Sequence, residues 1–161
     1  MKILIASLFF WGLQLAAQDR QSCPMHKEHQ TEVERHGDEA MGFPHDSTTH
    51  HFHILPDGGA IEVTVNDNKD AENVKAIRTH LTHIVTMFSN GDFSIPMFVH
   101  GQVPPGVTEM KDKRAEILYS LEELPDGGRV RISTKNHDVL NAIHDFLSFQ
   151  IRDHHTGDRT E

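Results

Sequence analysis

The side chains best suited to chemistry lie near the start of the chain, in the run Cys23-Pro24-Met25-His26 and in His29. Thiolate, thioether and imidazole groups are soft or borderline ligands, which bind copper or zinc in preference to magnesium or calcium. The pattern therefore predicts a metal site made of Cys23, Met25, His26 and His29. The alternative is a disordered tail in which the single cysteine has no role.

A second set of metal ligands occurs further along the chain. His80, His83 and Met87 are spaced i, i+3 and i+7, which places them on one stripe of a predicted helix. Met97 and His100 follow in a proline-constrained segment. Together these five residues could bind copper, or could give haem iron its axial ligands. The structural alternative is that the histidines flank a core and the methionines fill gaps in it.

Two further histidines, His51 and His53, lie in a predicted strand. Residues two apart project from the same face of a strand, so this pair could clamp one ion where the N-terminal segment meets the sheet. Seven of the fourteen histidines lie between His26 and His53. A histidine-rich segment could equally act as a low-affinity metal buffer without fixed geometry.

Two resemblances bear on these residues. The run from Cys23 to His26 resembles the Cys-Pro-Met-His core of heavy-metal-binding segments in bacterial copper-resistance proteins, which implies copper handling. Residues 41–158 are similar to a group of small exported bacterial proteins with no established activity, and this second resemblance implies export and a single domain, but no reaction. It is carried by Met41-Gly42-Phe43, Thr49-His50-His51-Phe52, the Asp-Gly-Gly turns, Gly91-Asp92-Phe93, Pro104-Pro105-Gly106 and Phe149-Gln150-Ile151.

The elements that must position these residues follow from periodicity and turn signals. Helical spacing of apolar residues predicts helices over 70–89 and 136–153. Strand-like runs at 50–55 and 60–66 flank one Pro-Asp-Gly-Gly turn, and 114–124 and 129–135 flank another. The residues between Gly91-Asp92 and the third strand are predicted to form a loop rich in proline and glycine.

The two halves of the chain, 50–92 and 114–158, share the order strand, turn, strand, helix and Gly-Asp. We predict an α+β fold in which a duplicated ββα unit forms an antiparallel sheet with two helices on one face. The alternative is that hairpin turns merely use similar residues. Open sheet edges would suit a homodimer.

The first residues predict the compartment of the protein. Lys2, the apolar run to Leu15 and the small residues Ala16-Ala17 are typical of a signal peptide, and the run is too short to span a bilayer. We predict a signal peptide over 1–17, a disordered, flexible histidine-rich arm over 18–48 and a single domain over 49–161. The protein would be periplasmic or secreted, without a membrane partner after cleavage.

The charge of the chain limits its partners. The formal charge of −9 becomes −10 without Lys2, since 14 basic and 24 acidic residues remain. Nucleic acid is excluded as a partner because phosphate binding requires clustered lysine and arginine. We expect a binding protein for copper, or zinc, in metal resistance or trafficking. The alternatives are a small haem- or metal-dependent oxidoreductase and a non-catalytic interaction module with pH-responsive histidines. The sequence contains no common catalytic motif, which favours a protein that is not an enzyme.

Overall fold

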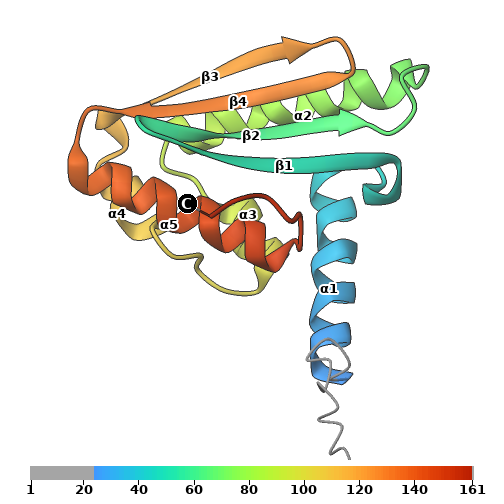
Figure 1. Ribbon diagram of the computed structural model, residues 1–161, viewed down its shortest axis with the longest axis horizontal. Helices are drawn as coiled ribbons and strands as arrows, with labels where there is room; N and C mark the ends of the chain where they lie inside the picture. The colour runs from blue at the N-terminus through green and yellow to red at the C-terminus, as the bar shows by residue number, and fades with distance from the viewer. Residues whose placement is uncertain (1–23, 161) are drawn as a thin grey trace, which may run out of the picture.

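The computed structural model describes residues 24–160, so the predicted signal peptide and Cys23 lie outside the described residues. The elements in chain order are α1 (Pro24–Met41), the 3-10 helix η2 (His45–Ser47), β1 (Thr48–Leu55), β2 (Gly58–Val65), α2 (Ala71–Ser89), α3 (Ser94–His100), α4 (Val107–Asp112), the 3-10 helix η3 (Arg114–Glu116), β3 (Ile117–Leu124), β4 (Gly127–Thr134) and α5 (His137–Asp153). The four strands form one antiparallel sheet in the order β1-β2-β4-β3 (Figure 1). Between residues 24 and 160, no helix has the length and apolar character needed to cross a membrane.

The predicted α+β fold is confirmed, with α2 and α5 packed on the same face of the sheet. Phe52, Ile61 and Val130 are neighbours across three strands and are buried beneath the helices. The opposite face carries a polar row, in which Glu62 pairs across the sheet with His51 and Arg129. One apolar face and one polar face are typical of an antiparallel sheet with a helical layer on one side.

Each helix covers the hairpin of the other half of the chain. A Cβ atom at Gly128 in β4 would lie 3.0 Å from Cδ1 of Leu81 in α2, and one at Gly59 in β2 would lie 2.1 Å from Cδ1 of Leu147 in α5. The second glycine of each Pro-Asp-Gly-Gly turn therefore lets a helix approach the sheet closely. This requirement explains why glycine occupies these strand positions despite its poor strand propensity.

A second pair of matched contacts joins each helix to a hairpin turn. Arg78 in α2 donates to the carbonyl of Leu124 (2.5 Å), and Nε2 of His144 in α5 lies 3.0 Å from the carbonyl oxygen of Leu55. Both carbonyls belong to the residue before the turn proline. The observed order β1-β2-α2 and β3-β4-α5 agrees with the predicted repeat of elements, while the duplication itself stays a prediction.

The structure differs from the sequence-based prediction in two segments. The predicted loop after Gly91-Asp92 contains α3 and α4. The predicted disordered arm is helical over Pro24–Met41, and within it the side chain of Val33 is only 1% exposed. The inward strip of α1 consists of Gln30, Val33, Gly37 and Met41, which have helical spacing. Because a polar residue and a glycine occupy two of these positions, a search for apolar periodicity does not detect the helix.

Candidate ligand pocket

A cavity of about 330 Å³ lies between the inner face of the sheet and the helices α1, α2, α3 and α5. We call it the central pocket. Its lining residues are Gln30, Val33, Glu34, Gly37, Met41, His45, Thr48, Thr49, His50, Phe52, Ile61, Val63, His80, Leu81, Ile84, Phe88, Ile95, Pro96, Val99, His100, Phe146, Gln150, His154 and Thr156. Most of this surface is apolar, and the histidines are its most common polar residue.

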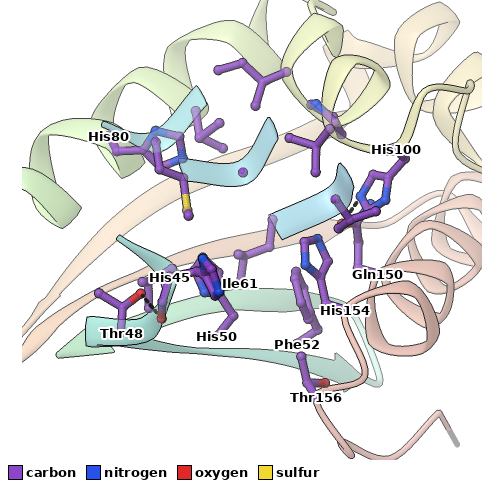
Figure 2. A pocket seen from close by; sticks show the side chains of 18 of the residues that line it. His45, Thr48, His50, Phe52, Ile61, His80, His100, Gln150, His154 and Thr156 are labelled. Carbon is purple, nitrogen blue, oxygen red and sulfur yellow. Dashed lines mark hydrogen bonds between the residues drawn. The ribbon is translucent and has the colours of Figure 1, made fainter. Parts of the chain in front are cut away.

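Five histidines line the central pocket: His45 comes from η2, and the other four come from four different elements. His50 comes from β1, His80 from α2, His100 from the end of α3, and His154 caps the C-terminus of α5. Figure 2 shows His80 and His100 toward opposite ends of the pocket, with His50 and His154 between them. The rings of His100 and His154 meet edge to face with centroids 4.9 Å apart, and those of His50 and His154 are 6.2 Å apart.

Burial keeps three of these imidazoles uncharged. It lowers the pKa of His50 and of His80 to about 4, and that of His154 to about 3. Neighbouring histidines lower these pKa values further, because two positive charges in one apolar cavity would repel each other. At neutral pH each ring can therefore donate one hydrogen bond and accept another.

The same three imidazoles lack protein partners. Within residues 24–160, no hydrogen bond is formed by the rings of His50, His80 and His154, and their nitrogens are not among the buried atoms sealed from solvent. These half-buried nitrogens still reach solvent, so water can satisfy them in the empty protein and a polar group of a ligand can take its place. The unpaired nitrogens consequently favour a polar partner inside the pocket.

His100 has a different role, because both of its nitrogens are engaged. Its Nδ1 donates to Oδ2 of Asp153 (2.5 Å), and its Nε2 lies 2.9 Å from Oε1 of Gln150. The other carboxylate oxygen of Asp153, Oδ1, lies 3.0 Å from Nε2 of His29 in α1. Burial raises the pKa of Asp153, but the contacts with His100 and His29 outweigh it and hold this pKa at about 2. The carboxylate is therefore charged and fixes the orientation of His100.

Aromatic contacts hold the other histidines. The ring of His154 stacks on Phe52, with centroids 5.7 Å apart, and His80 meets the edge of Phe43 at 5.9 Å. Phe43 and Phe52 are both buried. The imidazoles are thus positioned by packing, while their nitrogens remain available to a ligand.

The structure separates the predicted metal ligands of the domain. His80 and His100 line the central pocket, whereas His83 is exposed on α2 and does not line it. Met87 packs partly buried against the core, and Met97 is exposed on α3. These five residues therefore do not form one cluster.

His51 and His53 share a face as predicted, but it is the outer face of the sheet. Their ring centroids are 6.1 Å apart. Nδ1 of His51 lies 2.9 Å from Oδ1 of Asp158, and Nε2 of His53 lies 3.5 Å from Oε2 of Glu62. The pair is separated from the central pocket by the sheet itself.

The N-terminal set can be placed only in part. Cys23 lies outside the described residues, and His26 belongs to the first turns of α1. Met25 is 76% exposed, and His29 contacts Asp153. Among the side chains that the structure describes, no group of three or more His, Cys, Asp or Glu residues is placed to hold a metal ion.

Sequence reasoning missed His50, His154 and Gln150 as parts of the site. In β1, His50 points to the opposite face from His51 and to the same face as Phe52. Because an aromatic residue such as Phe52 is expected in the core, His50 could have been predicted on the inner face. Gln150 and His154 are spaced i and i+4 at the end of the last helix, next to Ile151 on its buried side. Both signals depend on knowing which face of the sheet the helices cover.

Comparisons with known proteins add no assignment to this geometry. No family model matches the chain, and no match is found among curated proteins or among solved structures.

Proposed function

We propose that the protein binds a small, largely apolar molecule that carries hydrogen-bonding groups, and that the central pocket is its site. The observation that carries this proposal is the set of three half-buried, uncharged imidazoles that line the pocket and whose nitrogens have no protein partner. A ligand that accepts or donates hydrogen bonds would satisfy His50, His80 and His154, and the apolar walls would stabilise the rest of the molecule.

The size of the cavity limits the ligand. A dry cavity of about 150 Å³ can hold benzene. The central pocket, at about 330 Å³, has room for a molecule of roughly two such rings. Haem, with four pyrrole rings and two propionates, is larger than this space, so we do not propose it as the ligand.

The placement of the imidazoles also favours a molecule over an ion inside the pocket. Metal ligands must converge on one point, with nitrogen atoms about 2 Å from the ion. His80 and His100 stand toward opposite ends of the pocket in Figure 2, and both nitrogens of His100 are already engaged. A molecule that fills the cavity can reach rings along its length, whereas a single ion cannot.

Two substitutions on the same helix test the proposal. The protein is incubated with a small-molecule extract of the cells that make it, separated from unbound compounds and examined by native mass spectrometry. We expect one compound to be retained, at about one molecule per protein chain. His80→Phe should reduce its retention at least about tenfold, because phenylalanine keeps the ring but cannot form a hydrogen bond. His83→Phe, on the exposed side of α2, is the matched control.

The result that contradicts the proposal is retention of no compound, or equal retention by both variants. Thermal melts of the variants show whether each still folds. Phe146, at the position of α5 that corresponds to His80 in the predicted repeat, already lines the central pocket, so an aromatic ring fits this kind of surface.

A second candidate function is the predicted binding of copper or zinc in resistance or trafficking, for which the protein would be exported. The supporting observations are the Cys-Pro-Met-His run and the exposure of its Met25 at the start of α1. Cys23, Met25, His26 and His29 would supply soft and borderline ligands at this end of the chain. In this second candidate function, the metal is bound outside the central pocket.

Elemental analysis of the untagged protein, purified from its own compartment without chelators, tests this second function. We expect nearly one copper or zinc per chain, lost in Cys23→Ser and kept in His80→Phe. Metal-free protein would remove the candidate. Metal kept by Cys23→Ser but lost in His80→Phe would transfer the metal site to the central pocket.

A further inference from the structure

The lining of the central pocket offers no free positive charge to an anionic ligand. Among the residues of 24–160 that line it, none is a lysine or an arginine. His45 also lines it, but the carboxylates of Asp38 and Asp46 lie 2.9 Å and 3.1 Å from its nitrogens. At the other end, the carboxylate of Asp153 is hydrogen-bonded to His100. A carboxylate or phosphate group inside the pocket would therefore lose its hydration without gaining a cationic partner.

A cationic ligand is also poorly matched to this lining. Glu34 is the one acidic residue among the lining side chains that the structure describes. It already accepts a hydrogen bond from Nε2 of Gln30 at 3.0 Å, and its side chain is 40% exposed. Because solvent screens such an exposed carboxylate, its attraction for a cation is weak. The walls consequently favour an uncharged molecule.

The apolar part of the lining is rich in aromatic rings. Phe52 of β1, Phe88 of α2 and Phe146 of α5 reach the pocket from three elements. Phe88 and Phe146 meet edge to face with centroids 6.0 Å apart, and Phe52 stacks on the ring of His154. A further aromatic ring can join such a group through the same stacked and edge contacts. The cavity of about 330 Å³ has room for roughly two benzene-sized rings.

The unpaired imidazoles select the polar groups of the ligand. A neutral imidazole has one donor and one acceptor nitrogen, and a hydroxyl group can likewise donate and accept. A hydroxyl group therefore pairs with an imidazole whichever nitrogen carries the hydrogen. A carboxylate can only accept and an ammonium group can only donate, so each of them fits one nitrogen alone.

These imidazoles lie at separate places in the pocket. His80 stands toward one end, whereas the ring of His154 is 4.9 Å from that of His100 at the other end (Figure 2). His50 lies between the two ends, with its ring 6.2 Å from that of His154. One small polar group cannot contact both His80 and His154, so a ligand that uses both must carry two polar groups.

We propose that the ligand of the central pocket is an uncharged two-ring aromatic molecule with two separate hydroxyl groups, one bound by His80 and the other by His154. This inference rests on the proposed function and names the chemical class of its ligand. The ring system would lie against the phenylalanines of the pocket, and the two hydroxyl groups would replace the water at the unpaired nitrogens.

Isothermal titration calorimetry at pH 7 with four probes of one shape tests the ligand class. The probes are 2,6-dihydroxynaphthalene, 2-naphthol, 2-naphthoate and 2-naphthylmethylammonium, of which only the last two are charged at this pH. We expect the diol to bind most tightly and 2-naphthol about tenfold more weakly, because it lacks one hydrogen bond. Each charged probe should bind at least about tenfold more weakly than 2-naphthol, since its charge finds no partner.

Variants then assign the two hydroxyl groups. In His80→Phe and in His154→Phe, the affinities for the diol and for 2-naphthol should differ by less than about twofold, because only one hydroxyl group still finds an imidazole. His83→Phe, on the exposed surface of α2, is the matched control and should keep the tenfold difference. A tenfold difference that persists in both pocket variants would contradict the assignment.

Three results with the unaltered protein would overturn the proposed ligand class: equal affinity for the diol and 2-naphthol, a charged probe that binds as tightly as 2-naphthol, or binding of no probe. These comparisons need no variant, so a substitution that prevents folding does not affect them. The retention experiment with a cell extract presupposes no ligand class and separately tests the proposed function. A charged compound whose retention depends on His80 would overturn the ligand class and leave the central pocket as the binding site.

Discussion

The uncharged imidazoles of the central pocket make the stability of the protein depend on pH. Packing positions His50, His80 and His154 so that their nitrogens face a cavity, and the protein gives those nitrogens no partner. These nitrogens reach solvent in the empty protein and can exchange water for a polar group of a ligand. A few polar groups in a largely apolar pocket are typical of sites that bind small molecules.

Acid should destabilise the protein through these three residues. Their pKa values of about 4, 4 and 3 in the folded protein lie below the value of ~6.5 in the unfolded chain, so the unfolded state binds more protons as the pH falls. Stability is therefore complete above about pH 6.5 and decreases below it, by about 2 kcal/mol per histidine at pH 5. Urea denaturation at pH 8 and pH 5 measures the loss.

His154→Gln identifies the source of that loss. Glutamine does not titrate, so the variant should lose about 2 kcal/mol less than the wild type between pH 8 and pH 5. His137→Gln, at the exposed start of α5, should behave as the wild type does. An equal acid sensitivity of His154→Gln and the wild type would show that His154 is not buried in the uncharged form.

At the scale of elements, the sequence predicts the sheet and its two covering helices well. Asp70 and Asn136 accept hydrogen bonds from the first turns of α2 and α5, at the positions where the predicted helices begin. The Pro-Asp-Gly-Gly turns lie between the strands that they predict. These elements carry strong local signals, namely apolar periodicity, caps and turn residues.

The elements that local signals do not predict are the ones that close the pocket. α3 is seven residues long and includes Pro96, so it has no extended periodicity. α1 is polar overall, and its apolar contacts with the core come from Val33 and Met41. The stability of both helices depends on tertiary packing rather than on propensity, which a single sequence does not show.

At the scale of the whole molecule, the site depends on how the layers are placed. His80 and His100 were predicted as ligands from their residue types, and the structure confirms only that they share one cavity. Their neighbours His50 and His154 come from the first strand and the end of the last helix, and only the folded layers bring them together. His51 lies on the outer face of the sheet, so the sheet separates it from His80 and His100.

The pocket also implies opposed effects of one substitution on stability and binding. Val63 is buried in β2 and lines the central pocket, so Val63→Phe should fill part of the cavity. We expect it to stabilise the ligand-free protein by about 1 kcal/mol and to weaken retention of the ligand at least about tenfold. Val130→Phe is the matched control, because Val130 lies in the filled core, where added volume should cost about 1–3 kcal/mol.

Denaturation and the retention assay on the same two variants separate a functional cavity from an ordinary packing defect. A cavity kept open for a ligand predicts greater stability and weaker binding in Val63→Phe. If instead Val63→Phe lost as much stability as Val130→Phe, the layers would already be in contact at this point, and no space would remain there for a ligand. Greater stability with unchanged retention would place the ligand outside the central pocket, because the added ring occupies the volume that the molecule needs.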